Sequence, residues 1–223
     1  MKRTFLLFLA AMTVGIAAGY SQPVDLARVK LEPVNVSVST ETVAGKNAVR
    51  LAKDPKVKAD DEATFAKLAG SDFKNGIIEV KVLSRLLPDA PDHARGLIGV
   101  AFRIDGSNSR FEAIYIRPTN GRADDQVRRN RATQYFSYPD FKFDRLRKEE
   151  PGKYESYADM GLNEWITLKI EVRDSRATLY VNGSLQPVLV VNDLKHGADQ
   201  SGAIGLWVDV GTDGYFADLS LLP

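Results

Sequence analysis

Apolar and polar residues alternate along most of the chain beyond residue 33. Residues 34–39 alternate valine with asparagine or serine, and residues 78–82 alternate isoleucine or valine with charged residues. A period of two residues is typical of a β-strand with one buried and one solvated face. Because helical periodicity is nearly absent, the pattern predicts an all-β protein.

Two pairs of such runs are joined by turn-forming residues. Residues 96–104 and 111–117 flank the sequence Asp-Gly-Ser-Asn-Ser, which predicts a hairpin. Residues 166–172 and 177–181 form a second pair, and Asn182-Gly183 follows them. That dipeptide is the strongest short signal for a hairpin turn, because both of its residues must adopt positive φ.

Further runs bring the expected total to roughly ten or eleven strands, the number and spacing of a sandwich or jelly roll. The later runs cover 188–191, 204–208 and 215–221. Residues 61–69 could form one or two helical turns. We see no internal repeat and no linker rich in proline, glycine or serine, so we expect one domain.

The alternation of apolar and polar residues largely disappears between residues 118 and 160, apart from a short possible strand at 133–137. This segment is rich in arginine, aspartate and aromatic residues. A connection of this length inside a β domain is usually functional or disordered, and disordered segments are poor in aromatic residues. We therefore expect an ordered loop that packs over one sheet face.

The N-terminus has the pattern of a secretory signal. Residues 1–3 carry two positive charges, residues 5–18 are apolar, and small residues follow. A membrane anchor is the alternative, but the apolar run is shorter than the roughly 20 residues that a spanning helix needs. We therefore predict a signal peptide at 1–21 and one β-sandwich domain at 22–223. The protein would be periplasmic, cell-surface or extracellular, without membrane attachment after cleavage.

Composition narrows the function classes. The 223 residues include no cysteine, which excludes disulfides and thiol chemistry, and this suits a bacterial periplasm or surface. Thirty basic and 29 acidic residues give a net charge of +1. Such a balance supplies no global field for nucleic acid, so we expect no nucleic-acid partner. The oligomeric state is left open.

Two stretches carry a family resemblance. The run Trp-Ile-Thr-Leu-Lys-Ile-Glu-Val at 165–172, followed by Leu-Tyr-Val-Asn-Gly at 179–183, resembles a hairpin of laminin G-like and other concanavalin A-like domains. The segments Gly-Ala-Ile-Gly-Leu-Trp at 202–207 and Phe-Ala-Asp-Leu at 216–219 resemble the closing strands of that superfamily. The chain is also similar to secreted bacterial domains that act on keto-sugar glycosides and are grouped as glycosyl hydrolases.

The resemblance spans about residue 75 to the end and implies an antiparallel β-sandwich of the concanavalin A-like jelly-roll kind. Members of this superfamily include lectins, adhesion modules, glucanases and lyases, so function has to be argued from the site. The glucanase branch carries a strand with three alternating acids, Glu-x-Asp-x-Glu. This sequence lacks that strand.

The second strand of the first hairpin carries the most informative polar residues. If Ile114 and Ile116 face the core, Tyr115 and Arg117 point to the opposite, accessible face. The same parity on the neighbouring strand places Arg103 on that face. Small residues beside these side chains form a trough with a flat ring for the C–H face of a sugar and rigid donors for its hydroxyls.

The adjoining loop adds planar polar side chains of the kind that read polyols or carboxylates. Our leading hypothesis is an exported carbohydrate-recognition domain that binds a saccharide on this face under the long loop. We expect saccharide contacts from six residues, Arg103, Tyr115, Arg117, Arg122, Gln134 and Tyr135. The alternative is that these charges form a surface ion network that anchors the loop.

A glycosidic-bond-cleaving enzyme, either hydrolase or lyase, is the second hypothesis. Two carboxylates would flank the glycosidic oxygen, one protonating it and the other activating water or attacking carbon. The catalytic candidates are Glu112, Asp124, Asp144 and Glu155. For Glu112, which has core-facing parity, an ion pair with an arginine is the alternative. A protein-binding adhesion module is the third hypothesis.

Metal chemistry has little support in the sequence. The two histidines, His93 and His196, lack the spacing of metal ligands. Asp209, Asp213 and Asp218 offer oxygen ligands of the calcium type, and laminin G-like domains often hold calcium. We therefore expect no cofactor, with calcium left possible.

Overall fold

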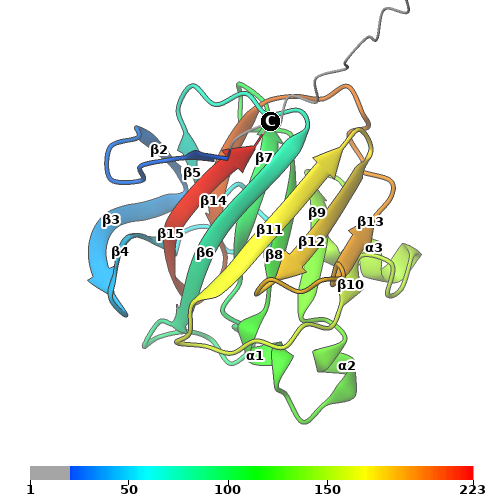
Figure 1. Cartoon of the computed structure of the whole chain (residues 1–223). Helices are drawn as coiled ribbons and strands as arrows, with labels where there is room; N and C mark the ends of the chain where they lie inside the picture. Colours follow the sequence, from blue (N-terminus) through cyan, green and yellow to red (C-terminus); the bar gives the residue numbers. More distant parts are fainter. Residues whose placement is uncertain (1–20, 223) are drawn as a thin grey trace, which may run out of the picture.

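The computed structural model describes residues 21–222, and these residues form two antiparallel β-sheets packed face to face (Figure 1). The predicted signal peptide lies outside the described residues except for its last one. No helix in the described part of the chain has both the length and the apolar character needed to cross a bilayer. The expected all-β sandwich of the jelly-roll kind is confirmed.

The first sheet, sheet A, contains the second predicted hairpin, at residues 166–172 and 177–181. Its strands lie in the order β13 (Leu189–Val191), β12 (Arg176–Val181), β11 (Ile166–Arg173), β6 (Gly76–Leu86), β15 (Thr212–Leu222), β4 (Lys46–Lys53) and β3 (Val36–Val43), and β1 (Gln22–Pro23) pairs with β15. Asn182 and Gly183 adopt positive φ of 51° and 73°, as the turn after β12 requires.

The second sheet, sheet B, is built around the first predicted hairpin. Its strands lie in the order β10 (Glu155–Ser156), β9 (Thr133–Tyr138), β8 (Phe111–Ile116), β7 (Ile98–Ile104), β14 (Ala203–Val208), β5 (Phe65–Leu68) and β2 (Leu31–Val34). The described residues thus contain fifteen strands, more than the alternation predicted. Very short strands such as β1 and β10 are too brief to show a period.

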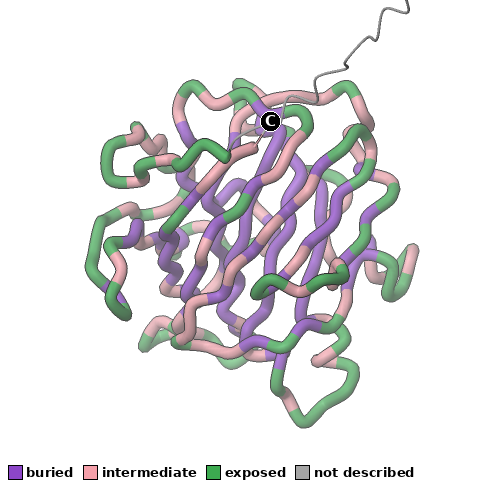
Figure 2. Tube along the Cα trace, in the orientation of Figure 1, coloured by how far each residue is buried: buried purple, intermediate pink, exposed green. Residues whose placement is uncertain are grey.

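The core lies between the two sheets. Val80 and Ile170 of sheet A and Val100 and Ile114 of sheet B are completely shielded from solvent, as the two-residue period requires. Each such side chain contributes about 1.5–3 kcal/mol by leaving water. In Figure 2 the buried positions follow the strands, and the exposed positions gather in the connections.

The expected helical turns at residues 61–69 are wrong. Residues 54–64 form a loop. Strand β5 follows and pairs with β14 on one side and β2 on the other. Phe65, Ala66 and Leu68 are all buried, so this strand next to the edge strand β2 is covered on both faces and lacks clean alternation. Burial in the sheet outweighs the weak helical preference of the segment.

The valine alternation at residues 34–39 belongs to two strands rather than one. Asn35 has a φ of 53° and separates β2 of sheet B from β3 of sheet A. A residue in this region turns the chain sharply, and asparagine tolerates it better than most residues. The chain therefore crosses between sheets inside an apparently uniform pattern.

The segment 118–160 is ordered, as expected. It contains three short helices, α1 (Pro118–Gly121), α2 (Gln126–Arg129) and α3 (Phe143–Glu149), together with β9 and β10. Figure 1 places α1 and α2 beyond the lower end of the sheets and α3 beside β10.

Part of this segment crosses the outer face of sheet B. The side chain of Lys142 pairs with Glu62, and the backbone N–H of Phe143 donates to the Asp61 carboxylate over 2.7 Å. Asp61 and Glu62 precede β5, whereas Lys142 and Phe143 follow β9 at the other side of the sheet. These two contacts span the outer face of sheet B between β9 and β5.

Candidate functional site

Tyr115 lies in a row of side chains on the outer face of sheet B. The strand register places Trp207 opposite Gly99, Gly99 opposite Tyr115, and Tyr115 opposite Gln134. A Cβ atom on Gly99 would lie 2.5 Å from the Tyr115 Cα atom, so only glycine fits there. The rings of Tyr115 and Trp207 then pack with centroids 4.7 Å apart. Tyr115 is 1% exposed, and its hydroxyl group accepts a hydrogen bond from Arg117.

Arg117, just beyond β8, is held in one position by its neighbours. Its Nη2 donates to the Tyr115 hydroxyl over 2.8 Å and to Gln134 Oε1 over 3.1 Å, and its Nη1 donates to the Arg131 carbonyl over 3.1 Å. The carboxylate of Glu155 lies 3.5 Å from Nη1. Four partners at these distances leave the guanidinium little freedom, so it is oriented before any ligand arrives.

A cavity of about 330 Å³ lies beside Tyr115 and Arg117. The loop before β5, the loop before β7, the α1–α2 region and α3 all contribute to its wall. The lining residues are Asp60, Asp61, His93, Arg95, Leu97, Tyr115, Arg117, Asn120, Arg128, Arg131, Phe143, Arg147 and Val210. We call it the arginine pocket.

Asp61 is the buried acid of the arginine pocket. It is 1% exposed and has a φ of 51°, an unusual backbone conformation for a residue other than glycine. One carboxylate oxygen accepts from Phe143, while the other, Oδ1, has no hydrogen-bond partner. Burial, reinforced by the charge of Asp209, raises the pKa of Asp61 to about 7.

A second buried carboxylate positions Asp61. Asp209 Oδ2 accepts the backbone N–H of Asp61 over 2.8 Å, and its Oδ1 pairs with the ammonium group of Lys53. Lys53 also donates to the Ala59 carbonyl over 2.6 Å. Both ends of residues 59–61 are therefore tied to one buried ion pair, which fixes the carboxyl group of Asp61 in the wall.

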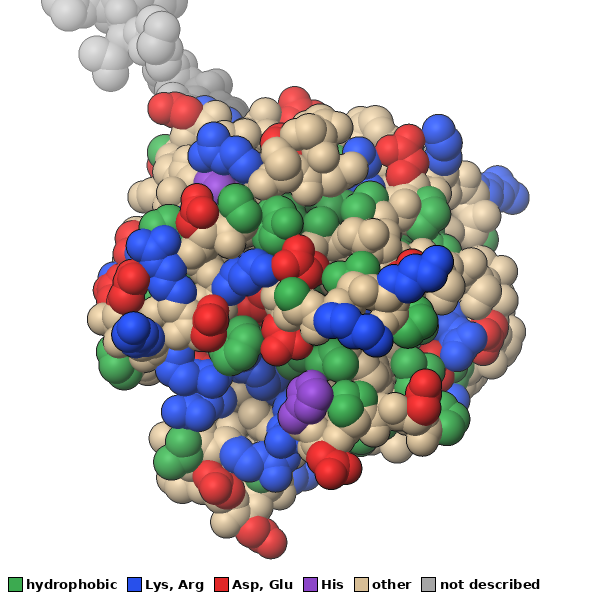
Figure 3. Space-filling model, turned by 180° about the vertical axis from the view of Figure 1, so that it is seen from behind, with side chains coloured by type: hydrophobic (Ala, Val, Ile, Leu, Met, Phe, Trp, Pro, Cys, Tyr) green, Lys and Arg blue, Asp and Glu red, His purple; other side chains and the backbone are tan. Residues whose placement is uncertain are grey.

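Positive charge dominates the arginine pocket. Figure 3 views the molecule from the side opposite to that of Figure 1 and shows basic side chains gathered around a hollow at the lower left. Arg95 donates only to backbone carbonyls among its hydrogen bonds, those of Asp92 and Ala94. Burial lowers the pKa of Arg95, and the charges of Arg128 and Arg117 lower it further. The guanidinium groups are thus close enough to repel one another.

Three of the six expected saccharide contacts lie on this face of sheet B. Tyr115 and Arg117 line the arginine pocket, and Gln134 is buried behind them as the acceptor for Arg117. Arg122 lies at the surface instead, where it pairs with Asp159 at 2.8 Å and Glu164 at 3.1 Å. The structure therefore places Arg122 outside the pocket lining.

Arg103 and Tyr135 do not share the face of Tyr115, so their expected placement is wrong. Arg103 has a φ of 54° at the register shift between β7 and β14, and this turns its side chain inward. It is fully buried and donates to the backbone carbonyls of Lys74 and Asp174, which belong to the loops of sheet A. Tyr135 lies opposite Ile114, and its hydroxyl donates to Glu112.

The four catalytic candidates do not converge on one cavity. Glu112 is buried and accepts from Tyr135 and from the backbone N–H of His196, so hydrogen bonds satisfy it rather than the ion pair we considered. Glu155 is held by arginines, including Arg147. Asp124 and Asp144 are exposed and lie outside the arginine pocket lining.

The three aspartates considered for calcium are also separate. Asp209 pairs with Lys53, Asp213 with Arg50 at 2.6 Å, and Asp218 with Lys46 at 2.7 Å. Within residues 21–222 no group of three histidine, cysteine or acidic side chains could hold a metal ion. The structure therefore does not bring these three carboxylates together as ligands of one ion.

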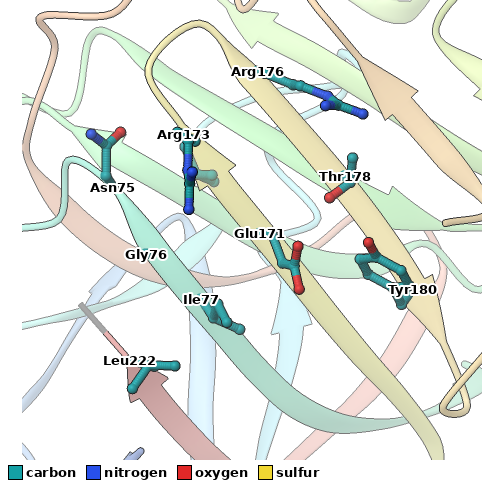
Figure 4. Close-up of a pocket in the computed structure, with 10 residues that line it drawn as sticks. Asn75, Gly76, Ile77, Glu171, Arg173, Arg176, Thr178, Tyr180 and Leu222 are labelled. Carbon is teal, nitrogen blue, oxygen red and sulfur yellow. The ribbon is translucent and has the colours of Figure 1, made fainter. Parts of the chain in front are cut away.

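A second hollow lies on the outer face of sheet A, and the sequence analysis did not single it out. It has a volume of about 590 Å³ and crosses β12, β11 and β6. Figure 4 shows Tyr180 and Glu171 side by side, with Arg173 and Arg176 near the end of the hairpin. Both arginines are exposed. We call this hollow the sheet A trough.

Comparisons with known proteins address the fold. No known family profile matches the chain, and no curated protein sequence matches it. Carbohydrate-binding module CBM66 from Bacillus subtilis superposes with a TM-score of 0.54 at 12% identity, over 86% of this chain and 97% of the module. The chain is similar in fold to this module.

A second solved structure gives the same result. A Bacillus subtilis protein of unknown function with a galectin-like fold superposes with a TM-score of 0.54 at 12% identity, over 91% of this chain and 94% of that one. Both similarities agree with the antiparallel β-sandwich jelly roll expected from the sequence. At this identity they show fold alone.

Sequence reasoning missed Asp61, Arg95 and Arg128 as members of the site. Arg95 and Asp61 come from loops that precede β7 and β5, far from the hairpin in sequence. The only local signal was the acidic sequence Asp60-Asp61-Glu62 before an apolar run.

Proposed function

We propose that this protein is an exported carbohydrate-recognition domain that binds a saccharide in the arginine pocket. The observation that carries the proposal is a cavity whose wall holds buried polar atoms without partners. Asp61 and Arg128 both line the pocket, and the buried atoms Asp61 Oδ1 and Arg128 Nε have no hydrogen-bond partner. Buried polar groups are normally paired, so a ligand with hydroxyl groups would complete this wall.

The remaining lining supplies the other features that sugar binding needs. The ring of Phe143 offers an apolar surface and is only partly buried, while Arg117 and Arg147 lie 5.8 and 4.9 Å from its centroid. Asn120 is 4% exposed and is held by its own amide donation to the Arg131 carbonyl over 3.1 Å. Fixed donors beside a ring reduce the entropy lost on binding.

The fold supports the same proposal. The similar solved structure is named as a carbohydrate-binding module, and a single β-sandwich can carry such a site without catalytic residues. Export by the predicted signal peptide at 1–21 would bring the pocket to glycans outside the cytoplasm. Both the binding and the export are part of the proposal.

Calorimetric titration with neutral and acidic oligosaccharides tests the site. Binding by the wild-type chain should weaken by about tenfold or more in Arg128→Gln, since one charged hydrogen bond is worth roughly that factor. The matched control is Arg176→Gln in the sheet A trough, which should bind like the wild type. Absence of binding to every saccharide by a folded chain would contradict the proposal.

Asp61 favours a second function, cleavage of a glycosidic bond. A buried carboxyl with a pKa of about 7 is protonated in part at neutral pH, as a general acid must be, and Asp60 lines the same cavity as a second carboxylate. If this function is correct, incubation with oligosaccharides will release new reducing ends or unsaturated ends. Asp61→Asn should then abolish the release while binding persists, and turnover that survives this change would overturn it.

A further inference from the structure

The arginine pocket has an excess of positive charge that the protein itself does not neutralise. Five lining residues are arginines, whereas its lining carboxylates are Asp60 and Asp61. Burial holds Asp61 partly protonated near neutral pH, because its pKa is raised to about 7. The lining therefore carries more guanidinium charge than carboxylate charge.

One nearby acid, Glu155, forms ion pairs with the arginines on one side of the pocket. Glu155 lies against Arg117, Arg131 and Arg147, with separations of 3.5 Å to the first and 3.8 Å to the second. Its side chain is 5% exposed and is not among the lining residues, so it lies buried behind the arginines. A single carboxylate shared by three guanidinium groups leaves a net positive field on that side.

The arginines on the other side have neutral partners. Arg95 donates to two backbone carbonyls, and Arg128 Nη2 lies 3.5 Å from the Thr119 carbonyl and 3.4 Å from Asn120 Oδ1. Arg128 Nε is buried without any partner. Carbonyl groups orient a guanidinium but do not cancel its charge, so both residues remain ready to pair with an anion.

Resting on the proposed saccharide site, we propose that the arginine pocket binds the acidic group of an anionic saccharide, a uronate carboxylate or a sulfate ester. Arg95 and Arg128 pair with this group, and Asp61 hydrogen-bonds a neighbouring hydroxyl through its free Oδ1. An arginine fork matches both acidic groups in shape. The neutral sugar ring alone would leave the two guanidinium charges uncompensated.

Titration of the full wild-type chain with trigalacturonic acid and with its carboxyl-reduced neutral counterpart tests this inference. The acidic trisaccharide should bind at least about tenfold more tightly, and the gap should narrow as salt is raised. Arg95→Gln and Arg128→Gln should each remove most of the preference, whereas Arg176→Gln should keep it. A sulfated trisaccharide as third ligand identifies which acidic group is preferred, and a preference for either group supports the inference.

The contrary outcomes separate the two proposals. Affinity for the reduced trisaccharide equal to that for both the uronate and the sulfated trisaccharide would overturn the acidic preference and leave the saccharide site standing. Binding of neither, together with no binding of neutral glycans by a folded chain, would overturn both. Displacement of trigalacturonic acid by inorganic phosphate at equal concentration would show that the pocket recognises an anion without any sugar. That result would also contradict the inference.

Discussion

The two outer faces of the sandwich carry similar residue types but differ in how those residues are held. On sheet A, Lys169 and Glu171 form an ion pair at 2.6 Å in which each side chain is 37% exposed. On sheet B, Arg117 pairs with Glu155 while both side chains are at most 7% exposed. An exposed pair is screened and mobile, whereas a buried one is fixed and its charge reaches further. The segment 118–160 contributes to this difference, since part of it crosses the outer face of sheet B.

The largest loss of stability is expected from removing the buried ion pair between Lys53 and Asp209. Asp209→Asn leaves Lys53 buried without its charged partner and loosens residues 59–61, which carry Asp61. We expect a loss of about 3–5 kcal/mol in the free energy of unfolding, measured by urea denaturation. The control is Asp218→Asn, whose side chain is 49% exposed and pairs with Lys46, and it should cost about 0–1 kcal/mol. Similar losses for the two variants would contradict the comparison.

The next effect concerns the pH dependence of stability. The pKa of Asp61 is raised from 3.8 to about 7 in the folded chain, so between about pH 4 and pH 7 the unfolded chain loses this proton first. The carboxyl group therefore lowers stability progressively as pH rises through this window, by on the order of 4 kcal/mol at the upper end. Asp61→Asn should become more stable relative to the wild type as pH rises, as measured by urea denaturation at several pH values. A difference independent of pH would contradict the burial of this acid.

A smaller loss of stability is expected from a change at Gly99, whose missing side chain allows β7 to lie close to Tyr115 of β8. A Cβ atom there would lie 2.3 Å from the Ile114 carbonyl oxygen, so Gly99→Ala forces the backbone of β7 and β8 apart. We expect a cost of about 1–3 kcal/mol, together with weaker saccharide binding, in thermal unfolding and calorimetry. Gly106→Ala is the matched control because nothing lies within 4 Å of its Cβ position, and it should be near neutral. A neutral Gly99→Ala would show that the outer row is not tightly packed.

The smallest effect is expected at Arg122, which the sequence placed in the site. Its side chain is 56% exposed and pairs with Asp159 and Glu164 outside the pocket lining. Arg122→Gln should change saccharide affinity by less than about twofold in calorimetry, as exposed pairs contribute little. A loss as large as that in Arg128→Gln would move the binding site toward the surface of the loop.

The sequence predicts the sandwich well because its fold depends on a repeated local pattern. The hairpins at Ile98–Ile116 and Ile166–Val181 follow from alternation and turn residues that lie close together in the chain. The positions of Tyr115 and Arg117 on the outer face follow from the same parity. The order of the strands within each sheet was not predicted, because it depends on pairing between distant segments.

The rest of the site depends on contacts that no local pattern contains. Arg103 has outward parity by simple alternation, but a register shift with a positive φ turns it into the interior. Asp61 and Arg95 reach the pocket from separate loops that long-range contacts hold in place, since Asp209 accepts the Asp61 N–H and the Arg95 carbonyl accepts the Thr119 N–H. A single shifted residue or a long-range ion pair leaves no periodic signal, so parity reasoning cannot find it.

The most direct measurement is a crystal structure of the protein soaked with acidic oligosaccharides, because it shows which outer face holds the sugar. The account predicts a saccharide in the arginine pocket, with its acidic group against Arg95 and Arg128 and a hydroxyl group on Asp61. A saccharide bound over Tyr180 in the sheet A trough, with the arginine pocket empty, would contradict it.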